Sequence, residues 1–312
     1  MSEGAGTEKG ERIAKRLARA GLCSRRDAER WIGEGRVAVD GHVLTTPAVL
    51  VTAASRIEVD GKPVGAAAPT RLWRYHKPRG LVTTHRDPQG RATIFASLSK
   101  RLPRVISVGR LDLNSEGLIL LTNDGELARH LELPATGWVR RYRVRAHGIV
   151  DPRRLTALEK GITIAGIAYG PVEAALERQQ GTNAWLIVSL REGKNREVRR
   201  ILEHLGLQVT RLIRMSYGPF QLGALERGAV EEVPGKVLKE QVGQEFIARK
   251  DPADASRRTP GRAASGAPGL PPQAGEGASS SLLRAAGEGR EGASPRRGLR
   301  HGRTNAHRRR PA

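Results

Sequence analysis

One stretch of the sequence, residues 105 to 125, constrains the fold of this chain more than any other. It reads VISVGRLDLNSEGLILLTNDG, with β-forming residues, then Gly109, then polar residues and an apolar run from Leu118 to Leu121. This order predicts a strand, an exposed turn, a buried strand and the start of a helix. Asn123 or Asp124 would cap that helix.

Asp112 lies on the predicted turn, and polar or charged side chains surround it at Arg110, Asn114, Ser115 and Glu116. Buried strands on both sides would hold its carboxylate rigidly at the floor of a cleft, as a catalytic group requires. Aspartate is also a common turn residue, so an ordinary turn is the alternative interpretation. This stretch by itself leaves both interpretations open.

The charge of the chain points to a polyanionic partner. Its 312 residues are enough for about two domains with a substantial core, and the formal net charge is +22. Residues 249 to 312 hold 14 Lys or Arg against 5 Asp or Glu, a net of +9, which leaves +13 for the rest. No amphipathic or apolar anchor accompanies this charge, so a nucleic acid is favoured over a membrane.

Several classes of site are excluded by residue usage. Cys23 is the only cysteine, which excludes a disulfide framework and a thiolate metal cluster. The eight histidines are scattered without a close ligand pair, so we expect no metal. The N-terminus has no apolar signal region and no run approaches the roughly 18 residues of a membrane span. We therefore expect a cytoplasmic protein without a membrane association.

The first part of the chain is typical of two short helices followed by hairpins. Ser24 and Asp27 form a capping box for the second helix. The Asp40-Gly41 and Asp60-Gly61 pairs are each typical of a two-residue hairpin turn. Together these signals predict a small αα-plus-hairpin module.

The two predicted helices of this module carry a row of cations. They are Arg12, Lys15, Arg16, Arg19, Arg25, Arg26 and Arg30. A solvated helix face is the ordinary interpretation, but the cations far outnumber their acidic neighbours, which favours contact with phosphates. A DNA-reading helix-turn-helix is disfavoured because strands follow so closely and the second helix has few Asn or Gln residues.

Strands and helices continue to about residue 248. Lys77-Pro78-Arg79-Gly80 is a tight basic turn that follows a strand at 72–76. Further strands are predicted at 139–148, 183–190 and 209–215, and helices at 152–160, within 192–206 and at 234–247.

Composition changes sharply after residue 248. The last part is rich in Gly, Ala, Ser, Pro and Arg, so we expect a disordered basic tail that adds nonspecific RNA affinity. The expected organisation is a flexible leader (1–11), a basic module (12–64), a linker (65–70), an α+β domain (71–248) and the tail (249–312).

Three stretches of the α+β domain occur in a recognisable order: GRLDLNSEGLILLTNDG, VRRYRV and EGKNREVRRILEHLGLQVTRLIRMSYG. They resemble, in order and character, the three catalytic motifs of the bacterial ribosomal RNA pseudouridine synthases of the RsuA/RluB type. The basic module, in ARAGLCSRRDAERWIGEGRVAVDG, resembles an S4-type RNA-binding domain, and the lysine-proline-x-glycine turn also fits that layout. The resemblance covers about residues 10 to 247.

This resemblance implies a fold and a reaction. The fold is α+β, with a small S4-like domain followed by a pseudouridine synthase domain on a mainly antiparallel mixed sheet. The reaction breaks the bond from the sugar C1′ to the base N1, turns the base, and joins C1′ to C5. No atoms enter or leave, so it needs a carboxylate but no metal, redox cofactor or nucleotide. The lack of P-loop and dinucleotide fingerprints agrees with this implication.

The resemblance also implies roles for individual residues. Asp112 would be the catalytic carboxylate, and Arg199 would pair with it and keep it ionised. Tyr142 would stack on the target base and accept or deliver a proton late in the reaction. Arg110 would hold a phosphate or fill the space of the extruded nucleotide. A surface helix arginine and a half-buried strand tyrosine are the ordinary interpretations of Arg199 and Tyr142.

Further RNA contacts are expected from other polar residues of the matching stretches. They are Lys77, Arg140, Lys194, Asn195 and Arg196. The expected partner is ribosomal RNA or a pre-ribosomal particle, bound by a monomer. Large-subunit 23S rRNA is favoured over small-subunit 16S rRNA, because the long basic tail is similar to the large-subunit branch of the family.

Two other classes of protein stay open. One is a non-catalytic RNA-binding protein of ribosome assembly, against which the intact Asp112, Tyr142 and Arg199 argue. The other is a DNA-binding regulator, against which the fused, catalytic-looking domain argues.

Overall fold

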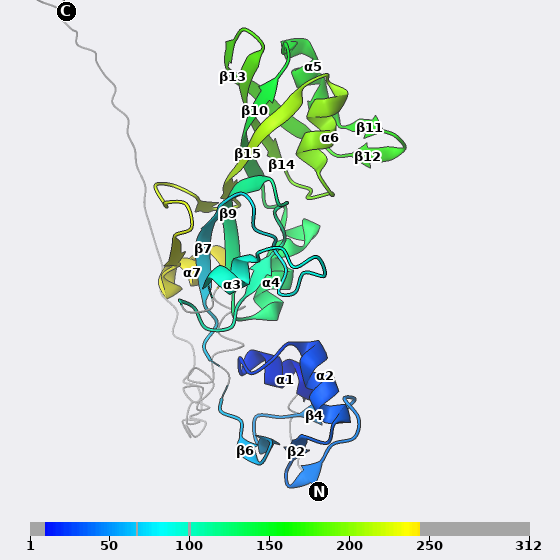
Figure 1. Cartoon of the computed structure of the whole chain (residues 1–312), viewed down its shortest axis with the longest axis vertical. Helices are drawn as coiled ribbons and strands as arrows, with labels where there is room; N and C mark the ends of the chain where they lie inside the picture. Colours follow the sequence, from blue (N-terminus) through cyan, green and yellow to red (C-terminus); the bar gives the residue numbers. More distant parts are fainter. Residues whose placement is uncertain (1–9, 67, 99–100, 244–312) are drawn as a thin grey trace, which may run out of the picture. The chain divides into compact units, whose positions relative to one another are not determined.

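Two regions of secondary structure follow one another along the chain in the computed structural model (Figure 1). The structure describes residues 10–66, 68–98 and 101–243. The tail expected at 249–312, and all but the last two residues of the leader expected at 1–11, lie outside the described residues.

The first region folds as two helices and a small sheet, as the sequence predicts. The helices are α1 (Ile13–Arg19) and α2 (Arg25–Gly33). The sheet has the order β3 (His42–Val43), β2 (Val37–Val39), β5 (Ile57–Val59), β6 (Lys62–Pro63), and β1 (Glu11–Arg12) pairs separately with β4 (Leu50–Val51). Apolar side chains of both helices and of the sheet form one core, which includes Ile13, Leu17, Ile32, Val37 and Ile57.

Local signals of this region are confirmed. The Ser24 hydroxyl accepts a hydrogen bond from the Asp27 N–H at 3.0 Å, and the Asp27 side chain accepts from the Ser24 N–H at 3.3 Å. Asp40 and Gly41 both have positive φ, which a type I′ hairpin turn requires at its two central residues.

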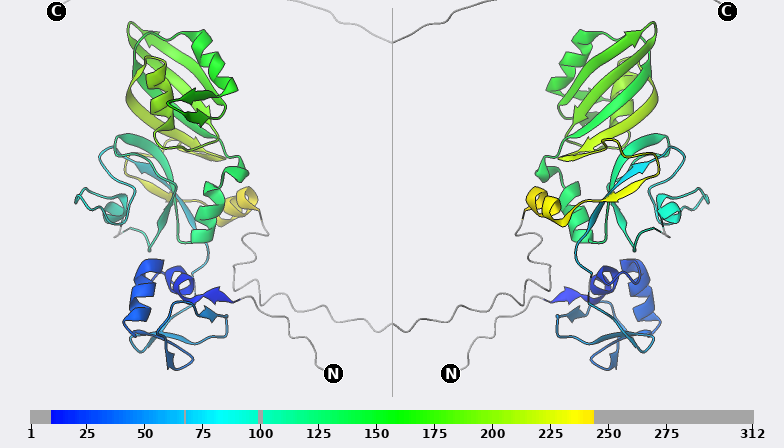
Figure 2. Two further views of the ribbon diagram at one scale, coloured as in Figure 1. Left: turned by 90° about the vertical axis from the view of Figure 1, so that its right-hand side faces the viewer. Right: turned by 90° about the vertical axis from the view of Figure 1, so that its left-hand side faces the viewer.

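The second region is built on one large mixed sheet, and helices are arranged on it (Figures 1 and 2). The strands are β7 (Leu72–Lys77), β8 (Ile106–Val108), β9 (Ser115–Thr122), β10 (Arg140–His147), β13 (Val172–Gln180), β14 (Asn183–Leu190), β15 (Gln208–Tyr217), β16 (Phe220–Gln221) and β17 (Val230–Glu232). The helices are α3 (Ile94–Leu98), α4 (Gly125–Glu132), α5 (Pro152–Ala157), α6 (Glu197–His204) and α7 (Gly235–Val242), with 3-10 turns at Pro134–Thr136 and Leu158–Lys160.

The strand order is β13-β14-β10-β15-β9-β7-β17, with β8 paired to β9 and β16 paired to β15. All of these pairs are antiparallel except β9 with β15, so the prediction of a mainly antiparallel mixed sheet is confirmed.

The helices cover different faces of this sheet. Val198 and Leu202 of α6 belong to the core on one face, and Leu127 of α4 and Leu238 of α7 belong to the core on the other.

Gly117 allows β9 and β15 to approach one another closely. In the parallel pair, Gly117 of β9 lies opposite Arg214 of β15. A Cβ atom on Gly117 would lie 2.6 Å from the Arg214 nitrogen and closer still to its carbonyl oxygen, and its φ is +104°. Only glycine therefore permits this approach of the two backbones.

Three features differ from the sequence prediction. β9 begins at Ser115, so Ser115 and Glu116 are buried in a strand and do not belong to the polar turn. A hairpin of β11 (Ile162–Ile164) and β12 (Ile167–Tyr169) and the long edge strand β13 were not predicted. The helix predicted at 234–247 is described over Gly235–Val242, and its remainder from residue 244 lies outside the described residues.

Replacing Gly117 with alanine should destabilise the second region by about 3 kcal/mol, because a methyl group would meet the Arg214 backbone at a positive φ. Gly223→Ala is the matched control, since Gly223 also has a positive φ but no atom lies within 4 Å of its Cβ position. That variant should cost about 1 kcal/mol. Urea unfolding of both variants measures the difference, and equal losses would contradict the importance of the close approach.

Candidate active site

The register of the sheet places four residues in one row across four strands. Tyr142 of β10 lies opposite Arg214 of β15, Arg214 lies opposite Gly117 of β9, and Gly117 lies opposite Lys77 of β7. Neighbouring strands are about 4.8 Å apart, so the row spans roughly 14 Å. The row includes the parallel pair of β9 with β15, and its member Gly117 follows the turn that carries Asp112 along the chain.

Lys77 holds the Asp112 turn through its main chain. Its ammonium group donates to the carbonyl oxygens of Ser115 at 2.8 Å, Asp112 at 3.1 Å and Leu113 at 3.5 Å. The Asp112 carbonyl also accepts from the Ser115 N–H at 3.0 Å. One cation therefore binds three carbonyls of a four-residue segment, which fixes the point from which the Asp112 side chain extends.

The segment after Lys77 holds the turn from another direction. The Gly80 N–H donates to the Leu113 carbonyl at 2.9 Å, and the buried Thr83 hydroxyl donates to the Leu111 carbonyl at 3.2 Å. The lysine-proline-x-glycine turn thus serves to position the Asp112 turn.

Burial contradicts the prediction that Lys77 contacts RNA, because its exposed fraction is 0%. Burial lowers its pKa to about 8, an effect that the carboxylates of Asp112 and Glu116 partly offset. The alternation of β7 could have indicated this, since Trp73, Tyr75 and Lys77 share the buried face of the strand.

Arg199 approaches the same turn from α6. Its guanidinium donates to the carbonyls of Val209 at 3.1 Å and Asn114 at 3.2 Å. Its exposed fraction is 6%, so it is not the surface arginine of the ordinary interpretation. Burial lowers its pKa, as does the nearby Arg196, whereas the charge of Asp112 acts in the opposite direction.

The expected direct pair between Arg199 and Asp112 is not formed in the described part of the chain, where no ion pair within 4.0 Å joins them. The guanidinium is instead engaged by main-chain carbonyls, one of them only two residues from Asp112. Arg199 therefore contacts the turn that carries the carboxylate, and its charge still acts on that carboxylate at longer range.

Two buried donors beside the row have no partner among the described residues: the Nε of Arg199 and one terminal nitrogen of Arg214. Arg214 donates its Nε to the Leu118 carbonyl at 2.6 Å and has an exposed fraction of 2%. Leaving a buried charged donor unpaired is costly, which marks this junction as a place where the fold gives up some stability. The sequence reasoning missed Arg214, although its strand position places it on the same face as Leu212 of the core.

Tyr142 faces the core that packs against α6, with Val144 and Val188 as members of the same cluster. Its exposed fraction is 8%, so its ring is largely buried in this core. The structure thus brings Tyr142, Asp112 and Arg199 to the same face at the junction of the two half-sheets.

Glu116 is a second buried carboxylate near the turn, but it is fully engaged. Burial tends to raise its pKa, yet the Arg211 guanidinium at 2.6 Å, with Arg227 at 3.5 Å, holds that pKa below its usual value. By contrast, the partly exposed Asp112 side chain makes no ion pair with any described residue. Asp112 is therefore the available carboxylate of this region.

Burial also contradicts the expected RNA contact of Arg140. Its guanidinium donates to the Tyr217 hydroxyl at 3.0 Å and to the Arg191 carbonyl, and it lies 4.8 Å from the centre of the Tyr217 ring. The side chain thus connects strand ends inside the domain. The remaining predicted contacts of this domain are exposed; they are Arg110, Lys194, Asn195 and Arg196.

Only some of the cations of the first region are as exposed as an RNA-binding face requires. Arg12, Arg25, Arg26 and Arg30 are exposed, whereas Lys15, Arg16 and Arg19 are partly buried. Glu11 forms ion pairs with Lys15 at 3.7 Å and Arg19 at 3.5 Å. Arg30 likewise pairs with Asp27 at 3.5 Å and with Glu34 at 3.7 Å, and the cations of this face still outnumber these carboxylates.

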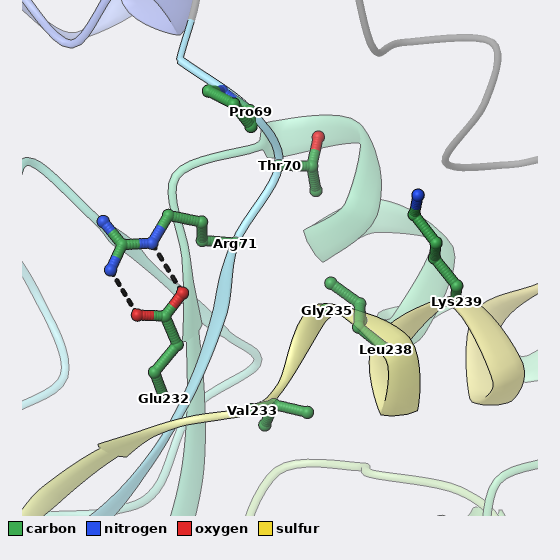
Figure 3. Close-up of a pocket in the computed structure, with 8 residues that line it drawn as sticks. All are labelled: Pro69, Thr70, Arg71, Glu232, Val233, Gly235, Leu238 and Lys239. Atoms are coloured by element: carbon green, nitrogen blue, oxygen red, sulfur yellow. Dashed lines mark hydrogen bonds and ion pairs between the residues drawn. The ribbon is translucent and has the colours of Figure 1, made fainter. Parts of the chain in front are cut away.

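A separate cavity of about 240 Å³ lies at the other end of β7 (Figure 3). Its walls include the Arg71 and Glu232 pair, joined at 2.6 Å, and the start of α7. Lys77 lies at the opposite end of the six-residue strand β7, roughly 17 Å away, so the cavity is not part of the Asp112 site.

The described residues contain neither a cluster of metal ligands nor a membrane-spanning helix. No three His, Cys, Asp or Glu side chains gather in an arrangement that could bind a metal ion. Among the described helices, none has the length and apolar character that crossing a membrane demands.

Comparison with known proteins identifies both regions. Residues 71–204 match the family described as RNA pseudouridylate synthase, and residues 11–57 match the S4 domain. An uncharacterized RNA pseudouridine synthase of Rickettsia felis is 50% identical over 229 residues, which are 73% of this chain and 99% of that protein. The ribosomal large subunit pseudouridine synthase B of Haemophilus influenzae is 41% identical over 265 residues, which are 80% of this chain and 73% of that protein.

Among solved structures, a crystal structure of a pseudouridylate synthase matches with a TM-score of 0.51 and 24% sequence identity. The match covers 74% of this chain and 99% of that chain. At this identity the likeness concerns the fold, and it agrees with the S4-like region followed by the mixed sheet.

Lys77→Met should destabilise the second region by about 2 kcal/mol at pH 7, because three carbonyls of the Asp112 turn lose their donor. The loss should grow between pH 8 and about 10.5. In that window the folded wild type has released the proton that the unfolded chain still binds, so wild-type stability rises with pH through this group.

Urea unfolding from pH 6 to 10 measures the difference, with exposed Lys160→Met as a control whose effect should not follow this window. A Lys77→Met deficit that does not change with pH would show that the buried ammonium group keeps its ordinary pKa, and a deficit that shrinks would show that its pKa is raised.

Proposed function

This chain belongs to the RNA pseudouridine synthase family, and we propose that it isomerises a specific uridine of ribosomal RNA to pseudouridine with Asp112 as the catalytic carboxylate. The observation that supports this assignment best is the fixed main chain of the Asp112 turn. Lys77 and Arg199 bind its carbonyls from two sides, while the carboxylate itself stays unpaired and partly exposed.

This geometry suits the reaction. The carboxylate must reach C1′ or a sugar proton of a nucleotide that has left its stack, so its backbone must not move when the nucleotide enters. Holding carbonyl groups does this without consuming the carboxylate oxygens. The neighbouring exposed cations Arg79 and Arg196 would attract the phosphates of the substrate to this turn.

We assign the other residues by their place around the turn. Tyr142 lies in the row that crosses the junction and would pack against the extruded base on the cleft side. Arg110 is exposed two residues before Asp112, where it can bind a phosphate next to the target. Arg199 acts as a positioning residue, because its guanidinium donates to the Asn114 carbonyl of the turn.

Large-subunit ribosomal RNA is the proposed substrate. The relatives from Haemophilus influenzae, Pasteurella multocida and Yersinia pestis, which are 41–43% identical to this chain, carry the name ribosomal large subunit pseudouridine synthase B. We further propose that residues 12–64 form the RNA-binding S4 domain and residues 71–248 the catalytic domain. The S4 domain would supply phosphate contacts through the exposed Arg12 and the exposed arginines of α2.

Asp112→Asn should abolish isomerisation while leaving RNA affinity nearly unchanged, because the amide has similar size but cannot act as nucleophile or base. Tritium release from C5-labelled uridine in large-subunit RNA measures turnover. The matched control is Asp151→Asn at the start of α5, where asparagine can also cap the helix, so this variant should stay active. Near wild-type release by Asp112→Asn would remove Asp112 from the mechanism.

Deleting residues 1–64 should weaken binding to a cognate RNA fragment and reduce the dependence of affinity on salt, while the Asp112 site stays folded. Titrations at several salt concentrations, with circular dichroism to confirm folding, measure both effects. An unchanged salt dependence would mean that the cations of α1 and α2 face solvent in the complex.

A further inference from the structure

The second half of the large sheet presents a row of arginines on the face opposite the Asp112 site. Side chains alternate along β10, so Tyr142 and Val144 point to the core while Arg141, Arg143 and Arg145 occupy the other face. Successive arginines on this face are about 7 Å apart, a spacing comparable to that between neighbouring phosphates of a nucleic-acid strand.

The basic row continues across the strands. Arg178 of β13 lies opposite Trp185 of β14, Trp185 lies opposite Arg145 of β10, and Arg145 lies opposite Arg211 of β15. The Arg143 guanidinium stacks 4.5 Å from the centre of the Trp185 ring. The face therefore combines cations with an aromatic surface, the combination that binds nucleic-acid strands without sequence preference.

This arrangement is unfavourable for the fold by itself. Arg145 and Arg211 are like charges directly opposite one another, which destabilises an antiparallel pair. Carboxylates compensate in part, since Glu177 pairs with Arg143 at 2.8 Å and Glu116 pairs with Arg211. The side chain of Arg141 is exposed and forms no hydrogen bond or ion pair with a described residue, so the face keeps an excess of positive charge.

The face is open to a partner. Helices α5 and α6 pack on the other side of this half-sheet, and in the right-hand view of Figure 2 its strands lie in front of those helices. Because Asp112, Lys77 and Arg199 lie on the helix side, a nucleotide in the active site cannot reach these arginines.

We propose that this arginine face, Arg141, Arg143, Arg145, Arg178 and Arg211, binds the phosphate backbone of a second segment of the folded RNA substrate. The proposal rests on the proposed function, since it takes the substrate to be a large RNA able to reach both faces of the sheet. Phosphate contacts of this kind add affinity and orientation, and they leave the choice of uridine to the cleft.

The first test compares a long structured RNA with a short hairpin that contains the target uridine. Arg141→Ala with Arg145→Ala should weaken binding of the long RNA about tenfold at low salt and lower its salt slope by about 1.5. Affinity for the hairpin, and tritium release from it, should not change. Arg141→Lys with Arg145→Lys keeps both charges and should bind the long RNA normally.

An equal loss of affinity for both RNAs, or none for either, would overturn the proposal. A wild type that binds and crosslinks the long RNA but releases no tritium from any RNA would instead overturn the proposed function, so the two failures are distinguishable.

The second test locates the RNA directly. Cys23 is buried, and burial raises the pKa of its thiol to about 11, so a thiol introduced on the surface can be labelled selectively. Arg141→Cys carrying a photocrosslinker should capture the long RNA far from the target uridine. Arg153→Cys on α5, on the helix side of the same half-sheet, is the control and should not capture that segment. Absence of RNA capture from position 141, or capture prevented by an acidic protein but not by competitor RNA, would overturn the proposal.

Discussion

The close contact of β9 with β15 is the constraint on which the catalytic region depends. It is the single parallel pair in the described large sheet, and it joins one half built from β13, β14, β10 and β15 to another built from β9, β7 and β17. Gly117 permits the approach because any side chain would collide with the Arg214 backbone. The turn before β9 therefore emerges at the middle of the sheet, where residues from both halves can surround it.

The groups around that turn act mainly on its backbone. Lys77 and Arg199 are both buried, and both donate to carbonyls within residues 112–115 while the Asp112 carboxylate stays unpaired. A direct ion pair would have stabilised the carboxylate at the cost of occupying its oxygens. Binding the carbonyls instead fixes the position of the turn and leaves both carboxylate oxygens available. Glu116, which is paired directly with Arg211, shows the alternative arrangement a few residues away.

Sequence patterns predicted much of this architecture because local chemistry determines it. The Ser24 and Asp27 capping box, the Asp-Gly turns and the alternating strand at 183–190 each depend on neighbouring residues, and each is confirmed. The pairing of β9 with β15 could not be predicted, since it joins residues almost 100 positions apart. For the same reason Lys77 and Arg140 were assigned to RNA, although alternation along β7 placed Lys77 on the buried face.

The two faces of the sheet meet two different requirements, extraction of one nucleotide and affinity for a long RNA. Extracting a nucleotide requires a site that holds one carboxylate rigidly with its oxygens unpaired. Affinity for a long polyanion instead requires many dispersed charges. Alternation of side chains along β10 meets both requirements. It places Tyr142 on one face of the strand and Arg141, Arg143 and Arg145 on the other. A single-residue shift in the register of β10 would exchange the two sets, so the pairing with β14 and β15 sets the sidedness of the enzyme as well as its fold.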